Sequence, residues 1–182
     1  MSAAPQEPLI PMSSQAAAPV SGAAYVERRR ARILEALSRP AERVAKDAEP
    51  LSPEGLDNFK RQGEDLYDNE LAWEELTDEE AIPGGHLTEM VFSGFLALIE
   101  GLLVEKVPAD ALAPARPHPD AVEEILTMLG DKYLDLTAYV ESGADSQKLV
   151  YARVMTGRLI DLVLYRLYGL TSGEIDRLEA AA

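Results

Sequence analysis

The run of apolar residues from Met90 to Val104 constrains the fold of this chain more than any other feature of the sequence. Glu100 interrupts the run, which is also shorter than the ~20 apolar residues that a membrane span needs. Its residues are apolar around nearly the whole circumference of a helix, and neighbouring helices bury a helix of that kind. We therefore predict a buried helix over 88–107, capped by Thr88, in a soluble cytoplasmic protein without a membrane span.

Apolar residues recur at helical spacing in several other stretches, while no stretch alternates β-branched with polar residues. The sequence therefore predicts an all-α fold, a helical bundle of about four main helices, with almost no sheet. Besides 88–107, the main helices are expected at 53–76, 120–141 and 146–168. Shorter helices are expected at 23–39, at 41–48, at 77–80 and after residue 171.

Local signals mark several of the expected helix ends. Ser52-Pro53 combines an N-cap residue with a proline suited to the first helical position. Thr171 and Glu174 have the spacing of a capping box, in which each side chain satisfies the backbone N–H of the other residue. Two glycines are placed to end the helices that precede them, at Gly143 and Gly169.

Composition divides the chain into three segments. Residues 1–24 are rich in Ala, Pro and Ser and carry one charge, at Glu7, so we expect a disordered N-terminal arm. Residues 25–82 are expected to form an acidic helical segment, which ends near the glycine pair at 84–85. Residues 83–182 are expected to form an apolar helical core.

The charge of the chain is strongly negative, because 32 acidic residues outnumber 17 basic ones and give a net charge of −15. Between Glu42 and Glu80 there are 14 acids and 4 bases. Charge of this sign repels nucleic acid, so direct nucleic-acid binding is not expected. The only candidate basic patch is the run Arg28, Arg29, Arg30 and Arg32. The acidic stretch is interpreted either as a solvated helical face or as a mimic of DNA charge.

Residues suited to catalysis or metal binding are few. The chain has no cysteine, which excludes disulfides, thiolate metal sites and thiol catalysis. The two histidines, His86 and His118, are too few for a multi-histidine metal site. There is neither a glycine-rich phosphate loop nor a GxSxG elbow. We therefore expect no catalytic residue, no cofactor and no metal; a deep pocket lined by His86 and several carboxylates would instead favour an enzyme.

The C-terminal segment reads IDLVLYRLYGLTSGEI from Ile160 to Ile175, and Glu179 extends the pattern. Residues 160–179 resemble the ID-xxx-YxLYGLTxxEI tail element of type IIG-like restriction–modification N6-adenine methyltransferases. In that family the element is helical and structural, and it is not the active site. The Asn-Pro-Pro-Tyr and glycine-rich AdoMet motifs of the family are absent here. The resemblance therefore implies a detached helical module, accessory to a DNA-modification or phage-defence complex.

Two of the expected helices are apolar on more than one face, and a small bundle cannot cover both. We therefore expect a protein partner or a homo-oligomer, and a non-catalytic helical interaction protein: an adaptor, assembly factor or small subunit. The alternative is an acidic inhibitor that mimics DNA and occupies a DNA-binding protein. The residues expected to contact a partner are Phe92, Phe95, Leu96, Tyr165, Tyr168, Glu74, Glu75 and Glu79.

Overall fold

The computed structural model describes residues 21–44, 48–71, 85–104, 116–143 and 146–181, which form helices and loops without a strand within those ranges. This confirms the predicted all-α fold. In chain order the helices are α1 (Gly22–Ala36), α2 (Pro53–Glu70), α3 (Gly85–Val91), α4 (Ser93–Leu103), α5 (Pro119–Glu141), α6 (Gln147–Leu167) and α7 (Ser172–Ala181). Most of the arm expected at 1–24 lies outside the described residues, but residues 22–24 belong to α1.

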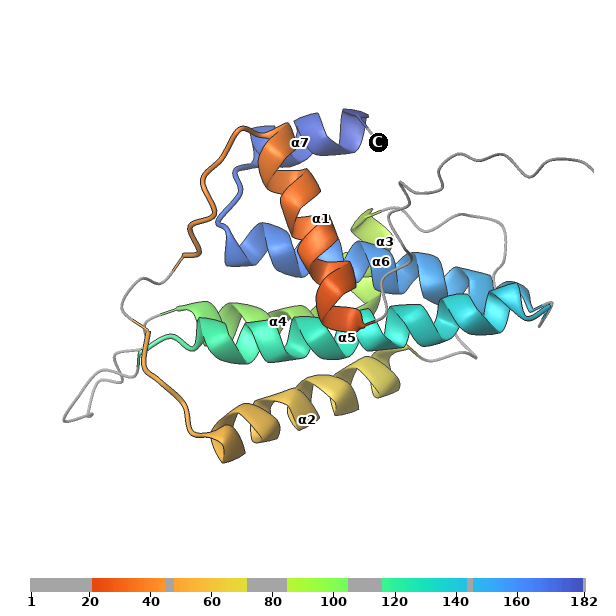
Figure 1. Cartoon of the computed structure of the whole chain (residues 1–182), viewed down its shortest axis with the longest axis horizontal. Helices are drawn as coiled ribbons and strands as arrows, with labels where there is room; N and C mark the ends of the chain where they lie inside the picture. The colour runs from red at the N-terminus through yellow and green to blue at the C-terminus, as the bar shows by residue number, and fades with distance from the viewer. Residues whose placement is uncertain (1–20, 45–47, 72–84, 105–115, 144–145, 182) are drawn as a thin grey trace, which may run out of the picture.

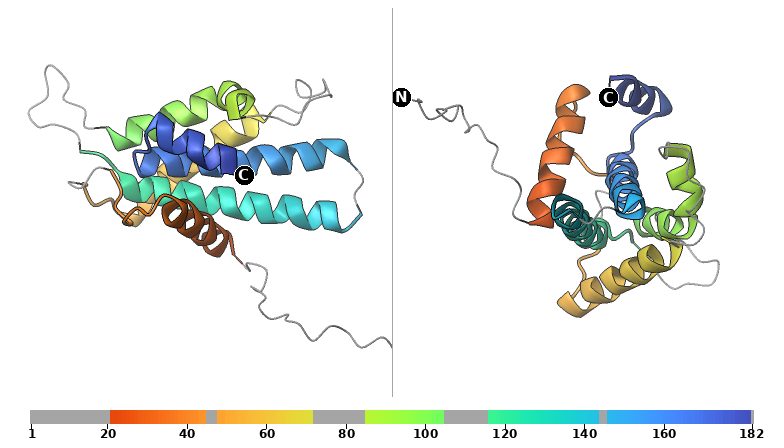
Figure 2. Two further views of the ribbon diagram at one scale, coloured as in Figure 1. Left: turned by 90° about the horizontal axis from the view of Figure 1, so that it is seen from above. Right: turned by 90° about the vertical axis from the view of Figure 1, so that its right-hand side faces the viewer.

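The long helices α5 and α6 run antiparallel at the centre of the bundle (Figure 1). Helices α1 and α2 pack on α5, α3 packs on α6, and α4 contacts both central helices. Seen end-on, the other helices surround this central pair (Figure 2). Within the described ranges, no helix combines the length and apolar character that crossing a membrane requires.

The hydrophobic core is one cluster, to which α1, α2, α4, α5 and α6 contribute buried residues. On α5, buried residues recur one helical turn apart, because Val122, Ile125, Leu126 and Leu129 share one face. Val26 and Tyr67, from the acidic helical segment expected at 25–82, lie in the same cluster. The core therefore extends across the boundary expected near residue 83, and burial of apolar surface joins the two segments.

The single helix predicted over 88–107 is wrong, because the chain breaks at Phe92 (φ −102°, ψ 32°) between α3 and α4. The carboxylate of Glu70, at the end of α2, accepts a hydrogen bond from the backbone N–H of Phe95 at 2.9 Å. The first N–H groups of a helix lack intrahelical partners and favour a negative charge, so Glu70 stabilises a new helix start there. Thr88, expected as a cap, is instead buried within α3.

The helix predicted at 41–48 is also absent from the described part of that stretch. The backbone N–H of Val44 donates to the carbonyl oxygen of Leu167 at 2.8 Å, so this segment bonds to the end of α6. Helix α2 begins at Pro53, as predicted, and ends at Glu70. The end predicted near residue 76 is wrong, because Leu71 already leaves the helical conformation (φ −78°, ψ 57°). Residues 72–76 and the helix expected at 77–80 lie outside the described residues.

Local signals predicted the helix ends at Ser52, Thr171, Gly143 and Gly169 correctly. The Ser52 hydroxyl oxygen accepts a hydrogen bond from the backbone N–H of Gly55 at 3.1 Å. Before α7, the Glu174 carboxylate accepts from the N–H of Thr171 at 2.8 Å, and the Thr171 hydroxyl accepts from the N–H of Glu174 at 3.2 Å. Two glycines with positive φ follow α5 and α6, namely Gly143 (86°) and Gly169 (59°).

Candidate functional site

The structure describes five of the eight residues that were expected to contact a partner. All five are buried in the core of this chain: Phe92, Phe95, Leu96, Tyr165 and Tyr168. The other three lie outside the described residues: Glu74, Glu75 and Glu79. Apolar spacing identifies a buried helix face, but it does not say whether this chain or a second chain buries it.

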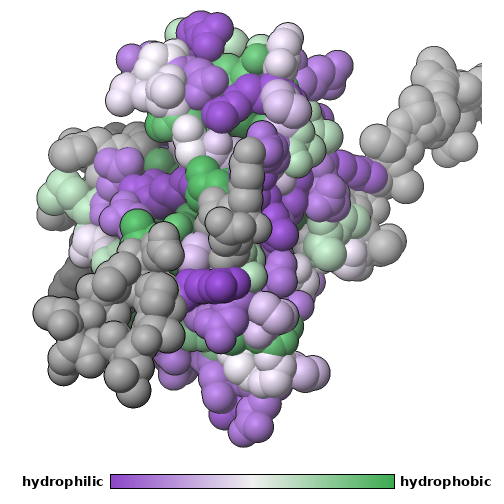
Figure 3. Space-filling view, turned by 90° about the vertical axis from the view of Figure 1, so that its left-hand side faces the viewer, coloured by the Kyte–Doolittle hydropathy of each residue, from purple (hydrophilic) through white to green (hydrophobic). Residues whose placement is uncertain are grey.

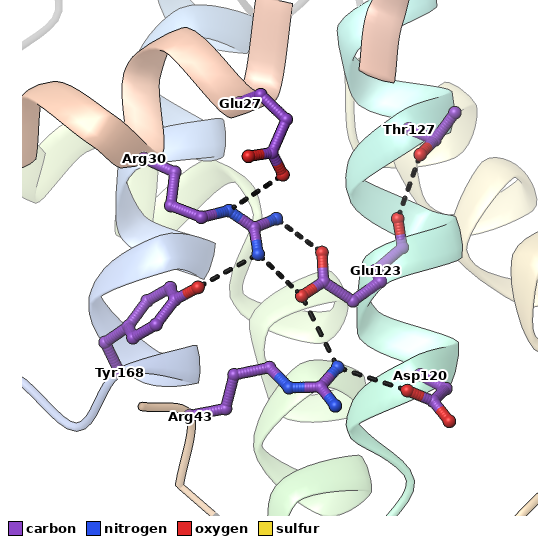
Figure 4. Close-up of polar contacts among 7 residues, drawn as sticks. All are labelled: Glu27, Arg30, Arg43, Asp120, Glu123, Thr127 and Tyr168. Atoms are coloured by element: carbon purple, nitrogen blue, oxygen red, sulfur yellow. Dashed lines mark hydrogen bonds and ion pairs between the residues drawn. The ribbon is translucent and has the colours of Figure 1, made fainter. Parts of the chain in front are cut away.

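A cluster of polar contacts joins α1, α5 and the end of α6 around Arg30 (Figure 4). The Arg30 guanidinium donates to the Glu123 carboxylate at 2.8 Å and to the Tyr168 hydroxyl at 2.9 Å. Arg43, from the segment after α1, reaches the carboxylates of Asp120 at 3.1 Å and Glu123 at 3.4 Å. Glu123 thus binds two arginines from different parts of the chain.

Burial and pairing shift the protonation equilibria in this cluster. The hydrogen bond to the Glu123 carboxylate raises the pKa of Arg30, which stays cationic. Burial raises the pKa of the Tyr168 hydroxyl above its usual range, so that hydroxyl stays neutral. Arg30 is a fixed charge that holds helices together, because its side chain is only 14% exposed and its acceptors belong to this chain.

The neighbouring arginine of α1 has the same role. The Nε of Arg29 donates to an Asp161 carboxylate oxygen of α6 at 2.9 Å, and Nη2 donates to the other oxygen. This bidentate pair raises the pKa of Arg29. Two of the four arginines in the basic run, Arg29 and Arg30, therefore attach α1 to α5 and α6.

The residues that carry the restriction–modification resemblance also make contacts within this chain. Asp161 binds Arg29, and Tyr168 accepts from Arg30. Glu179 accepts hydrogen bonds from Arg158 at 2.7 Å and from the Tyr165 hydroxyl at 3.3 Å. In this chain, residues 160–179 join α6 to α1 on one side and to α7 on the other.

An apolar groove of about 470 Å³ lies between the ends of α4 and α6 and the start of α7. Its apolar walls include Val44, Leu103, Val104, Leu170 and Ile175, and Tyr165, one of the residues expected to contact a partner, also lines it. Val104 is 54% exposed, although it follows a buried helix. Figure 3 shows the end of the molecule where α4 and α6 finish, with hydrophobic surface (green) between hydrophilic side chains (purple).

Charged side chains border this groove. The Nε of Arg166 on α6 donates to the Glu100 carboxylate of α4 at 3.0 Å, and Glu89 of α3 also lines the groove. Exposed pairs of this kind contribute little to stability, but they set the charge that a partner meets at the rim. An apolar centre inside a charged rim is the composition of a protein interface.

A second cavity, of about 380 Å³, lies between α2, α4 and the segment before α5. His118 lines it, with its ring centroid 5.6 Å from that of Phe59. The side chain of His86 is outside what the structure describes, so the predicted alternative of a His86 pocket is not addressed. Among the described residues, no group of three or more His, Asp or Glu side chains could hold a metal ion.

Comparison of this chain with protein-family models, with curated proteins and with solved structures found no match.

Proposed function

We propose that this chain is a non-catalytic helical interaction protein that binds a protein partner through the groove between α4, α6 and α7. The observation that carries the proposal is the groove itself, an apolar cleft of about 470 Å³ next to the exposed Val104. Exposed apolar surface of this kind, surrounded by charged residues, is typical of protein interaction sites. An adaptor, assembly factor or small subunit would leave such a surface open until its partner binds.

The roles of the polar clusters support the proposal. Arg29, Arg30 and Arg43 form their ion pairs with carboxylates of the same chain, so these residues hold α1 and the following segment on the bundle. The groove has a different composition, since Val44, Leu103, Val104, Leu170 and Ile175 are among the residues that line it. The resemblance of residues 160–179 adds a setting for the proposal, a DNA-modification or phage-defence complex in the cytoplasm.

The proposal is tested by substituting a charge into the groove. Val104→Asp places a carboxylate on the apolar wall, and tagged wild-type and variant proteins are used to capture partners from the native cells. Val150→Asp is the matched control, because Val150 is also exposed (39%) but belongs to the first turn of α6, away from the groove. We expect quantitative mass spectrometry to show a partner that Val104→Asp loses and Val150→Asp retains.

Loss of the partner with both variants, or with neither, would contradict the groove as the binding surface. Circular dichroism and size-exclusion chromatography of the two variants would show that each remains folded. A partner that also carries a methyltransferase or nuclease domain would support the setting that the C-terminal resemblance suggests.

The alternative function, a DNA mimic, is favoured by one observation on α2. Exposed residues at 54, 57, 61, 65 and 68 share one face, because a helix has ~3.6 residues per turn. Four of the five are acidic: Glu54, Asp57, Asp65 and Asp68. Two neighbouring cations reduce the charge of this face, since Arg61 pairs with Asp57, and Lys132 pairs with Asp68 at 3.5 Å.

A nuclease competition assay tests this alternative. The variant Glu54→Gln, Asp65→Asn and Asp68→Asn removes three charges from the α2 face. Its matched control removes three exposed charges elsewhere, through Asp135→Asn, Glu141→Gln and Asp176→Asn. A DNA mimic would inhibit a nuclease of the same host, and the α2 variant alone would lose inhibition. A wild-type protein that leaves DNA cleavage unchanged would remove this alternative.

A further inference from the structure

A cleft of about 350 Å³ between α1, α6 and α7 brings three arginines together. Arg29 and Arg32 come from α1, and Arg158 comes from the middle of α6. Apolar side chains form another part of the wall, contributed by Ile33, Ala36 and Leu178. The cleft does not overlap the groove proposed above except at Tyr165, which lines both.

The local charge of this cleft is opposite in sign to that of the chain. Its lining contains three arginines and two carboxylates, those of Asp161 and Glu179, which leaves a net charge of +1. The whole chain carries −15. Asp161 is paired with Arg29, and Glu179 is paired with Arg158. Arg32 is exposed, and no described residue forms an ion pair or hydrogen bond with its guanidinium.

The paired arginines also retain hydrogen-bond donors. A guanidinium has five N–H donors, and Arg158 uses Nη2 for Glu179. The Nε of Arg158 is buried, and within the described part of the chain no atom accepts a hydrogen bond from it. That buried Nε is closed to a molecule in the cleft, so the donors of Arg158 that remain for a ligand are those of its Nη groups. Arg29 donates to Asp161 through Nε and Nη2, which leaves Nη1.

We propose that this cleft binds a small organic molecule that carries a phosphate or carboxylate group. The oxyanion would be held by Arg32 together with the free donors of Arg158 and Arg29, because a guanidinium forms two parallel hydrogen bonds with such a group. The apolar part of the ligand would lie on Ile33, Ala36 and Leu178. The volume suits a small ligand, since binding pockets measure ~300–1,000 Å³.

Nuclear magnetic resonance titration of the full chain tests the proposal with three probes: inorganic phosphate, phenyl phosphate and benzoate. Inorganic phosphate and phenyl phosphate differ in the apolar ring, so comparing them measures the contribution of the apolar contact. Phenyl phosphate and benzoate both carry the ring, so comparing them shows whether the cleft prefers a phosphate or a carboxylate. We expect at least one ring-bearing probe to bind in a saturable manner. The amide signals of Ala36, Leu178 and Ala181, which line the cleft, should shift most.

Two charge-reversal variants give the decisive comparison. Arg32→Glu should weaken binding at least tenfold, and Arg32→Lys, which keeps the charge but loses the paired donors, should weaken it less. Arg177→Glu is the matched control, since Arg177 is exposed on α7 and does not line the cleft. The affinity of this variant for the probe should stay within twofold of the wild-type value. The proposal is overturned if no probe binds, if the shifts map elsewhere, or if Arg177→Glu weakens binding as much as Arg32→Glu.

Discussion

Two glycines determine how closely α1 approaches α5. A Cβ atom on Gly130 would overlap the backbone of Gly22, and the N–H of Gly22 donates to the Asp131 carboxylate at 2.8 Å. Backbone atoms cannot move aside as a flexible side chain can. We therefore expect Gly130→Ala to lower the free energy of unfolding by about 1–3 kcal/mol, the cost of overpacking, in a urea titration. Gly173→Ala on α7 is the control, because no atom lies within 4 Å of its added methyl group.

The Gly173→Ala control should leave the stability unchanged or raise it slightly, because alanine favours a helix. Equal effects of the two alanine substitutions would contradict the close approach of α1 and α5. The sequence does not reveal this contact, because Gly22 and Asp131 are 109 residues apart.

The buried hydroxyl of Tyr67 makes the free energy of unfolding depend on pH in the alkaline range. It lies 2.7 Å from the Thr156 hydroxyl, which itself donates to the Ala152 carbonyl, and burial raises the pKa of Tyr67 from 10.0 to about 12. The stabilisation is fully present below pH 10 and is lost as the pH rises through 12, because only the unfolded chain releases the proton in that interval.

We expect the free energy of unfolding to fall less steeply between pH 10 and pH 12 in Tyr67→Phe than in the wild type. At neutral pH the same variant should be less stable by about 1 kcal/mol, the loss of one hydrogen bond. Urea titrations at several pH values measure both effects. A slope that does not change in the variant would show that Tyr67 is not the group responsible.

Glu123 holds the arginine cluster together, because it is the acceptor that Arg30 and Arg43 share. We expect Glu123→Gln to destabilise the fold by about 1.5–3 kcal/mol in thermal or urea unfolding, the range for hydrogen bonds to charged groups. The control is Asp57→Asn, which breaks an exposed ion pair with Arg61 on a single helix and should have a smaller effect. A larger effect of the control would contradict the stabilising role of Glu123 in the arginine cluster.

At the scale of elements, the helix ends that local residues determine were predictable, and those that distant residues determine were not. Ser52 and Thr171 bond to backbone groups three residues away, so the sequence reveals both caps. The break at Phe92 depends on Glu70, whose carboxylate accepts a hydrogen bond from the N–H of Phe95. These two residues lie 25 positions apart in the chain. No local pattern records that contact, and the apolar run therefore resembles one helix.

Helix α7 depends on its capping box more than on burial, because none of its residues is buried. Removing the cap with Thr171→Ala should therefore loosen this helix first. We expect hydrogen exchange of the α7 amides to accelerate about fivefold, which corresponds to about 1 kcal/mol, while the amides of α5 keep their protection. Thr137→Ala, which removes a hydroxyl bonded within α5, is the control. Equal acceleration in both helices would indicate global unfolding instead.

At the scale of the whole molecule, the sequence predicts the fold class and the apolar helices, but it does not predict the surface that remains open. The groove combines Val44, Val104 and Leu170, which lie in three separate parts of the chain. The spacing of Phe95 and Leu96 indicated only that they are buried, and they are buried by this chain. Only the packing of α4, α6 and α7 distinguishes the groove from the core.

Site-specific photo-crosslinking in native cells tests the central claim, binding of a protein through the groove, most directly. A photoreactive amino acid would replace Val104 in one protein and, as control, Val150 in another; both residues are exposed and apolar. We predict one dominant protein adduct from position 104 and none from position 150. No adduct at position 104, or the same adducts from both positions, would contradict the groove as the binding surface.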